Sequence, residues 1–153
     1  MVTGAATRAV TFPVTRRRWQ GFHDAWREAG GASAELRVAV CPDNSAAAGE
    51  AFAAELFRAA GPPDAIAAMS DELALGALRA AARAGLAVPG DVAVSGWDDS
   101  DAAGPAGLTT LAQSLRDQGS RCARLVLGHR EPPGQDQPHW EVIPRSTTRL
   151  PGS

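Results

Sequence analysis

The fold is decided by the stretch Ala65-Ile-Ala-Ala-Met-Ser-Asp-Glu-Leu-Ala-Leu-Gly-Ala-Leu-Arg79, followed after a Gly/Pro turn by Asp91-Val-Ala-Val-Ser-Gly-Trp-Asp-Asp99. A short apolar run ends at Ser70, a helix begins there, and a second apolar run stops at Trp97-Asp98-Asp99. This order predicts a strand, a helix and a second strand. Open parallel sheets bind ligands in the crevice beyond the carboxyl ends of their strands. We therefore expect the functional residues at that edge.

Length and composition describe a globular domain. The chain has 153 residues, of which 44% are hydrophobic and 21% are charged, and a chain of this length buries about 70% of its unfolded surface in one core. Its net charge of −2 at pH 7 provides no general attraction for phosphate backbones, so nucleic acid is not expected as a direct partner. All 15 basic residues are arginine, which excludes chemistry that needs a lysine.

The two cysteines and the first residues of the chain indicate the cellular compartment of the protein. Cys41 and Cys122 are far apart and have no metal-ligand spacing, so two reduced thiols and no metal site are expected. Residues 1–8 lack the apolar core of a signal peptide, and no run approaches the ~20 apolar residues that a membrane span needs. We expect a cytoplasmic protein without a cofactor and without a membrane partner.

Strands and helices alternate along the chain, which predicts an α/β fold. Helices are expected at residues 15–29 and 46–60, between Ser70 as N-cap and Gly85 as C-cap, and at 113–127. Strands are expected at residues 36–41, 65–69, 91–99, 108–111 and 140–143, with the tail of another at 1–4, and loops at 5–14 and 128–139. Trp19, Phe22, Trp26 and Ala29 recur at helical spacing, so this face should pack on the sheet.

Six short motifs follow one another in a fixed order. They are Arg18-Trp-Gln-Gly-Phe22, Ser70-Asp-Glu-Leu-Ala-Leu-Gly-Ala77, Val88-Pro-Gly-Asp-Val-Ala-Val94, Gly96-Trp-Asp-Asp99, Leu108-Thr-Thr-Leu111 and Arg145-Ser-Thr147. Together they resemble the effector-binding domain of the lactose-repressor/galactose-repressor (LacI/GalR) family of transcription regulators. The resemblance implies a parallel-sheet fold like that of periplasmic sugar-binding proteins, and a non-catalytic domain that senses a small, sugar-like effector.

The resemblance also implies a domain organisation. Family members carry a helix-turn-helix and an amino-terminal subdomain ahead of the matching region, so we expect a partial sensing domain, truncated at its N-terminus. Residues 1–110 would be mainly the C-terminal subdomain, residues 111–139 a helix and loop returning toward the missing N-terminal subdomain, and residues 140–153 the final strand and tail. The expected partners are a small polar effector and a second copy in a homodimer, with DNA contacted only through a helix-turn-helix that this chain lacks.

Two charged residues are central to the expected effector site. Arg18 matches the family arginine that hydrogen-bonds the effector, and its planar guanidinium can hold two ligand oxygens. It stands at a helix start, where a cation opposes the helix dipole by roughly 0.3–1 kcal/mol and needs solvent or a polar partner. Asp98 matches the family's ligand-binding aspartate, although it could instead cap its loop. Trp97 either covers the ligand or plugs the edge of the sheet.

Two further candidate ligand-binding residues depart from the family pattern. Ser70 stands where the family usually has Asn, so one hydrogen-bonding end of an amide is missing and the side chain is shorter. Asn44 stands where an aromatic residue often stacks on the ligand. The effector is therefore either different and more polar, or binding has decayed.

Other classes of function are possible on the same residues. Asp98 and Asp99 at a strand end are similar to the acidic pair of phosphoryl-transfer enzymes, but the absence of lysine and of a histidine constellation disfavours catalysis. An assembly or dimerisation module, or a decayed fragment, would bind no small molecule. Leu73, Leu75 and Leu78 suit either a core or a subunit interface. We favour the sensing domain and expect no enzyme activity.

Overall fold

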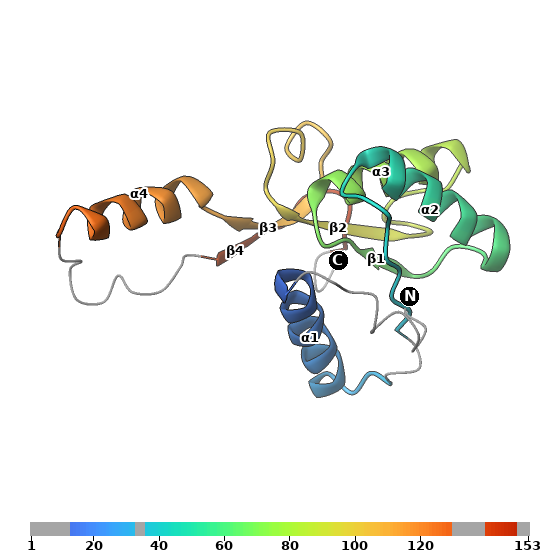
Figure 1. The fold of residues 1–153 in the computed structure, drawn as a ribbon. Helices are drawn as coiled ribbons and strands as arrows, with labels where there is room; N and C mark the ends of the chain where they lie inside the picture. Colours follow the sequence, from blue (N-terminus) through green and yellow to red (C-terminus); the bar gives the residue numbers. More distant parts are fainter. Residues whose placement is uncertain (1–12, 33–35, 130–139, 150–153) are drawn as a thin grey trace.

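The computed structural model describes residues 13–32, 36–129 and 140–149. Its elements occur in the order α1 (Pro13–Glu28), α2 (Ala46–Ala60), β1 (Ala65–Ala67), α3 (Asp71–Arg83), β2 (Ala93–Asp98), β3 (Thr109–Gln113), α4 (Leu115–Val126) and β4 (Trp140–Ile143) (Figure 1). The predicted strand tail at residues 1–4 and most of the predicted loop at 128–139 lie outside the described residues.

The four described strands form one sheet in the order β1-β2-β3-β4. Strands β1, β2 and β3 are parallel, with Ile66 opposite Val94 and Gly96 opposite Thr110, whereas β4 is antiparallel to β3. The predicted α/β class and mainly parallel sheet are confirmed. Because β1 and β2 run in the same direction, the residues that follow them emerge at one edge of the sheet.

Serine side chains begin the helices of the central unit. Ser45 accepts a hydrogen bond from Ala48 N at 3.1 Å, and Ser70 accepts one from Leu73 N at 3.3 Å, as expected of N-caps. The predicted C-cap of α3 is wrong by one residue, because Ala84 is the cap and Gly85 follows it. Gly85 has a φ of +70°, a conformation that glycine adopts without the steric cost of a Cβ.

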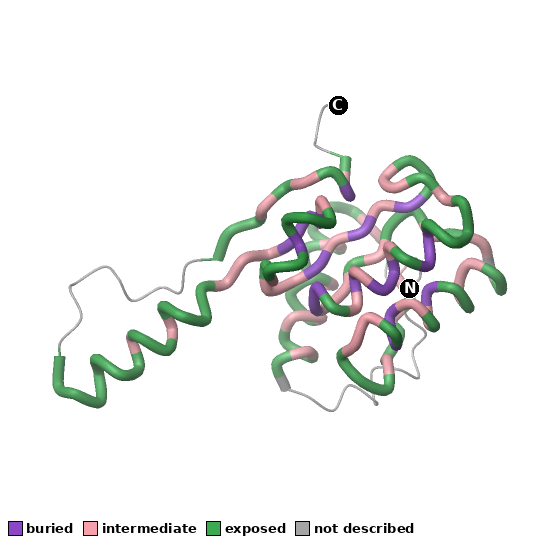
Figure 2. The backbone as a smooth tube through the Cα atoms, turned by 90° about the horizontal axis from the view of Figure 1, so that it is seen from above, coloured by how far each residue is buried: buried purple, intermediate pink, exposed green. Residues whose placement is uncertain are grey.

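The core lies between the sheet and the layer formed by α2 and α3 (Figure 2). Its buried side chains are small or medium in size: Ala53, Ala74, Ala77, Ala80, Ala81, Val92, Val94, Ala103 and Leu108. The two helices approach each other closely at glycines. A Cβ on Gly76 would lie 2.5 Å from Glu50 N and closer still to the Ala46 carbonyl oxygen, and one on Gly49 would overlap the backbone of Leu73.

The predicted strand at residues 36–41 is not part of the sheet. The segment lines a cavity of about 1460 Å³ whose other walls include α1, α2 and β1. We call this space the α1 cavity. The prediction of a strand is wrong because a β-rich sequence forms a strand only where a neighbouring strand pairs with it, and the cavity separates this segment from the edge of β1.

Helix α1 confirms the predicted helix but not its predicted packing. Its aromatic face looks toward the sheet across the α1 cavity, which Trp19, Phe22 and Trp26 line. Phe22 remains 38% exposed, and Ala29 is exposed beyond the end of the helix. The expected tight contact between this face and the sheet is therefore absent among the described residues, because the α1 cavity lies between the two layers.

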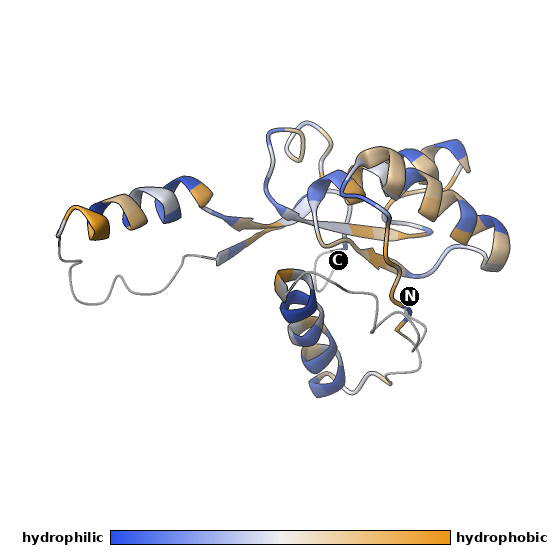
Figure 3. Ribbon diagram, viewed as in Figure 1, coloured by the Kyte–Doolittle hydropathy of each residue, from blue (hydrophilic) through white to orange (hydrophobic). Residues whose placement is uncertain are grey.

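Helix α4 and strand β4 project from the rest of the molecule (Figure 1). No residue of α4 is buried, and Val126 and Val142 are 87% and 62% exposed. In Figure 3 the far end of α4 has the orange colour of hydrophobic residues. None of the described helices combines the length and the apolar character that crossing a bilayer requires.

The close contact between α2 and α3 predicts the effect of adding one methyl group. Gly76→Ala should destabilise the protein by roughly 1–3 kcal/mol, because the new Cβ meets backbone atoms that cannot move without separating the helices. Gly119→Ala in α4 is the matched control: nothing lies within 4 Å of its Cβ, so the better helix propensity of alanine should stabilise by up to about 1 kcal/mol. Urea unfolding measures both. Equal effects at the two positions would contradict the assigned helix contact.

Candidate functional site

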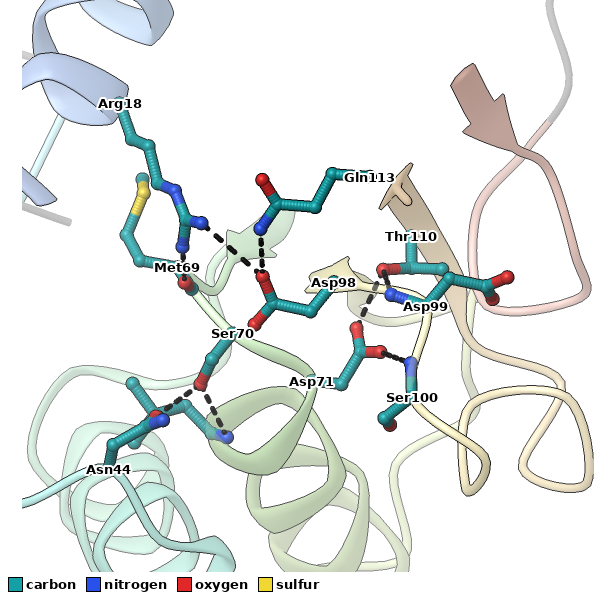
Figure 4. A network of polar contacts seen from close by, with 11 residues as sticks. Arg18, Asn44, Met69, Ser70, Asp71, Asp98, Asp99, Ser100, Thr110 and Gln113 are labelled. Carbon is teal, nitrogen blue, oxygen red and sulfur yellow. Dashed lines mark hydrogen bonds and ion pairs between the residues drawn. The ribbon is translucent and has the colours of Figure 1, made fainter. Parts of the chain in front are cut away.

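The carboxyl ends of the three parallel strands meet at one edge of the sheet, as Figure 4 shows. Met69 and Ser70 follow β1, Asp98 is the last residue of β2, and Gln113 is the last residue of β3. The start of α1 lies beside this edge and extends Arg18 toward it. Polar groups from four separate elements of the chain are therefore brought together.

Arg18 and Asp98 form an ion pair at this edge, with 3.3 Å between Nη2 and Oδ1. The other terminal nitrogen, Nη1, donates to the Met69 carbonyl oxygen at 2.8 Å. The guanidinium also lies over the ring of Trp97, 4.5 Å from its centroid, within the range of a cation–π contact. These contacts hold the planar group in one orientation. The structure thus brings together the two residues that the sequence analysis placed at the centre of the site.

Gln113 is a member of the site that the sequence analysis missed. Its Nε2 donates to Asp98 Oδ1 at 2.6 Å, so this oxygen receives hydrogen bonds from both Gln113 and Arg18. Within the described residues, the second carboxylate oxygen of Asp98 receives none and keeps its capacity to accept. Gln113 was assigned to the start of a helix, whereas it ends β3. Extending the predicted strand by two residues would have placed it at the functional edge.

The backbone of Asp98 has an unusual conformation that directs its side chain. Even-numbered positions of β2 face α3, where Val94 is fully buried and a Cβ on Gly96 would contact Ala74. Asp98 instead has a φ of +109° and contacts Arg18 and Gln113 (Figure 4). Conformations of this kind cost a residue with a side chain about 1–3 kcal/mol and persist where neighbouring contacts enforce them.

A buried carboxylate supplies that enforcement. Asp71, the first residue of α3, is 1% exposed and accepts hydrogen bonds from Thr110 Oγ1 and from Ser100 N, both at 2.6 Å. The same threonine oxygen accepts from Asp99 N at 3.3 Å. The two residues after Asp98 are therefore fixed to the start of α3 and to β3.

Asp99 points away from Asp98 and has a different partner. Its carboxylate accepts from Arg145 Nη2 at 2.8 Å, while Arg145 Nη1 donates to the Leu108 carbonyl oxygen at 2.7 Å. This pair attaches the segment after β4 to the loop that follows Asp98. Asp98 and Asp99 therefore do not form a joint acidic pair. In the described parts of the chain, His, Cys, Asp and Glu nowhere gather in a group of three that could hold a metal ion.

Ser70 and Asn44 contact each other. Ser70 is 5% exposed; its hydroxyl accepts from Leu73 N and donates to Asn44 Oδ1. A hydroxyl has a single proton, so this donation directs the Asn44 carbonyl toward Ser70 and leaves the Asn44 amide nitrogen as the free donor end. Both residues line the α1 cavity together with Arg18 and Asp98.

Trp97 contacts both the Arg18 guanidinium and the ring of Trp140. Arg18 lies over it on one side, and Trp140 of β4 contacts it edge-on with 6.2 Å between ring centroids. Its indole Nε1 is buried and has no hydrogen-bond partner among the described residues. The geometry fits a role at the sheet edge that orients Arg18.

The two cysteines lie outside this cluster. Cys41 and Cys122 are both free thiols. Burial, and secondarily the negative charge of Asp43, raises the pKa of the Cys41 thiol above its ordinary value. The raised pKa keeps the thiol protonated at neutral pH and lowers its reactivity.

Comparison with known proteins gives one consistent result. The family described as periplasmic binding protein-like domain matches residues 2–149. The HTH-type transcriptional regulator YvdE of Bacillus subtilis is 34% identical over 135 residues, which cover 82% of this chain and 42% of that protein. The chain thus spans less than half the length of that curated relative.

Solved structures show the same likeness. A putative transcriptional regulator of the LacI family from Sanguibacter keddieii superimposes with a TM-score of 0.70 at 31% identity, covering 85% of this chain and 51% of that one. A LacI family transcriptional regulator from Enterococcus faecium with bound ribose gives a TM-score of 0.73 at 27% identity, covering 88% and 51%. The chain corresponds to about half of each regulator.

The backbone conformation of Asp98 yields a sharp prediction about stability. Asp98→Ala and Asp98→Gly both remove the carboxylate, and glycine in a strand is normally less stable than alanine by roughly 0.5–1 kcal/mol. Here the order should reverse, with Asp98→Gly more stable than Asp98→Ala by about 1 kcal/mol or more, because glycine adopts a positive φ freely. Urea unfolding measures the difference. The same pair of substitutions at Asp101, which has no positive φ, is the control and should show the normal order.

The buried carboxylate of Asp71 gives a second prediction. Asp71→Asn should lower the free energy of unfolding by about 1–3 kcal/mol. The Asn amide nitrogen is a donor, and it would face either Ser100 N or Thr110 Oγ1, each of which donates to Asp71. Glu72→Gln is the control: Glu72 is exposed in the same helical turn, so its loss affects the helix dipole alone, by roughly 0.3–1 kcal/mol. Thermal and urea unfolding compare the variants. If Asp71→Asn is as mild as its control, Asp71 does not hold the loop.

Proposed function

Because the chain belongs to the family of periplasmic binding protein-like domains, we propose that it senses a small polar effector as part of a LacI-type transcriptional regulator. The observation that carries this proposal is that Arg18 and Asp98 form an ion pair at the wall of the α1 cavity, which Asn44 and Ser70 also line. One guanidinium and one carboxylate of opposite charge give the site no net charge. Such a site suits a neutral molecule rich in hydroxyl groups, which both donates and accepts hydrogen bonds.

Each residue has a distinct role in the proposal. The free oxygen of Asp98 accepts from ligand hydroxyls, Arg18 donates to ligand oxygens, and the Asn44 amide donates from the opposite wall. Ser70 positions Asn44 and contributes no free proton of its own. Hydrogen bonds to charged groups contribute roughly 1.5–3 kcal/mol each, which corresponds to about ten- to a hundredfold in affinity. Trp97 holds Arg18 in the orientation that these contacts require.

The proposal extends to the rest of the regulator. Residues 1–110 act mainly as the C-terminal subdomain, and residues 111–139 form a helix and loop that lead toward an N-terminal subdomain. Residues 140–153 form the final strand and tail. The projecting, apolar α4 supports this division, because its exposed face needs a packing partner. An effector would then bind between two walls, of which this chain supplies one. Homodimer formation, DNA contact through a helix-turn-helix and action in the cytoplasm belong to the same proposal.

Phosphoryl transfer is the less favoured alternative. It would need Asp98 and Asp99 to share a divalent cation, but the two carboxylates point apart and pair with different arginines, Arg18 and Arg145. We therefore assign these residues to binding and give them no catalytic step. The structural neighbour from Enterococcus faecium was solved with ribose, which supports a sugar-like ligand for this chain as well.

Ligand-dependent stabilisation tests the proposed site. D-Ribose and a panel of other neutral sugars should raise the melting temperature of the full 153-residue chain, because a ligand that binds the native state stabilises it in proportion to its concentration over Kd. Asp98→Asn should abolish the shift, or weaken the affinity by about tenfold or more. Differential scanning fluorimetry and isothermal titration calorimetry measure both.

The matched control is Asp101→Asn. Asp101 is exposed in the loop that follows the site and should leave the sugar response unchanged. A sugar-induced shift that survives in Asp98→Asn would remove Asp98 from the site. Inorganic phosphate belongs in the panel, and a larger response to phosphate than to every neutral sugar would contradict the proposed class of ligand.

A further inference from the structure

The segment that begins with β4 contacts the residues on both sides of Asp98. Trp140, the first residue of β4, packs edge-on against Trp97 with 6.2 Å between ring centroids. Arg145, shortly beyond the end of β4, donates through Nη2 to the Asp99 carboxylate at 2.8 Å. The two chain neighbours of Asp98 are thus both held by residues of one later segment.

Arg145, which begins the last of the six sequence motifs, is itself fixed to the start of β3. Its Nη1 donates to the carbonyl oxygen of Leu108, a fully buried residue, at 2.7 Å. Its backbone N donates to the hydroxyl of Thr109 at 2.8 Å, and Thr109 is also buried. The guanidinium therefore has a buried anchor on one side and Asp99 on the other. Because the anchor is fixed, the guanidinium sets the position of the Asp99 carboxylate.

The backbone at Asp98 and Asp99 needs such a restraint. Both residues have a positive φ, +109° and +50° respectively, and this region is unfavourable for a residue with a Cβ. Two such conformations in succession persist only where contacts enforce them. The bond from Asp99 N to Thr110 Oγ1 is long, at 3.3 Å. The shorter, charged bond to Arg145 is the stronger restraint on Asp99.

We propose that Arg145 is a positioning residue for the effector site: by holding Asp99, it keeps the backbone of Asp98 in the conformation that directs the carboxylate into the site. This role rests on the proposed function, which assigns the Asp98 carboxylate to a ligand. Without the bond from Arg145, the segment relaxes toward an ordinary extended strand, in which even-numbered positions of β2 face α3. The free oxygen of Asp98 would then leave the α1 cavity that it now lines.

A positioning role separates affinity from stability. Arg145 and Asp99 keep 22% and 33% of their side-chain surface exposed, and ion pairs between partly exposed side chains contribute little to folding. A misdirected Asp98 carboxylate, by contrast, loses a charged hydrogen bond to the ligand, which corresponds to about tenfold or more in affinity. An arginine with a merely structural role would show the opposite pattern, a loss of stability with unchanged affinity.

Calorimetric titration of the full chain with D-ribose tests this pattern, with the tightest-binding neutral sugar of the panel in its place if ribose does not bind. Arg145→Met removes both hydrogen bonds of the guanidinium and should weaken sugar affinity about tenfold, with little change in the urea midpoint. Arg149→Met is the matched control. Arg149 follows in the same tail and donates to the Gly90 carbonyl oxygen at 2.6 Å, at the opposite end of β2 from Asp98. Its loss should leave the sugar affinity unchanged.

A second variant shows whether Arg145 acts through Asp99. Asp99→Ala removes the carboxylate that Arg145 holds, so it should also weaken sugar binding about tenfold. In this background Arg145→Met should cause no further loss, because two changes to one interaction are not additive. The Asp99 variant also keeps the proposal testable if Arg145→Met does not fold.

A third comparison needs no ligand. The difference in urea midpoint between Asp98→Gly and Asp98→Ala reports how strongly the structure enforces a positive φ at this position. In the Arg145→Met background this difference should fall by at least about half, because a relaxed backbone no longer penalises alanine. In the Arg149→Met background it should stay as it is in the wild-type chain.

Four results would overturn the proposal: unchanged sugar affinity in Arg145→Met, an equal loss in Arg149→Met, additive losses with Asp99→Ala, or an unchanged difference between glycine and alanine at position 98. A wild-type chain that responds to no neutral sugar contradicts the proposed function instead. The comparison at position 98 then still decides whether Arg145 holds the backbone of Asp98, so the two failures are distinguishable.

Discussion

The buried carboxylate of Asp71 is the constraint on which the site depends. Three segments that are distant in sequence meet at this group: the start of α3, the loop after β2 and the start of β3. The contact needs Gly96, because a Cβ there would overlap the Asp71 carboxylate. With the loop fixed on either side of it, Asp98 takes a backbone conformation that the strand alone would not adopt, and its carboxylate reaches the opposite face of the sheet.

The sequence predicts most of the central architecture, since each of its local signals agrees with the others. The apolar run before Ser70, the N-cap at Ser70 and the glycine at Gly85 together specify β1, α3 and the turn that follows. The prediction fails at residues 36–41, where a β-rich run has no pairing partner among the described residues. It fails again at the aromatic face of α1, because helical spacing identifies an apolar stripe but does not say whether another layer lies within contact distance.

The candidate site is predictable in part for a related reason. Arg18 and Asp98 are recognisable from motifs, and the parallel topology explains why they meet. Gln113 is missed because its position depends on the exact end of a strand, which is the least certain feature of any sequence-based assignment. The contact between Ser70 and Asn44 joins residues 26 positions apart. No local pattern predicts this contact, which places the side-chain amide of Asn44, just before α2, beside the N-cap of α3.

Arg18 has a second consequence that concerns the mechanics of the molecule. The guanidinium that would bind a ligand also attaches α1 to the sheet through its hydrogen bonds to Met69 and Asp98. Elsewhere along α1, the α1 cavity lies between the helix and the sheet. A ligand oxygen that accepts a hydrogen bond from the Arg18 guanidinium would compete with these two contacts. Ligand binding at the sheet edge and the attachment of α1 to the sheet thus depend on the same guanidinium. A ligand that draws on it would therefore alter the position of α1 directly, with no other residue between them.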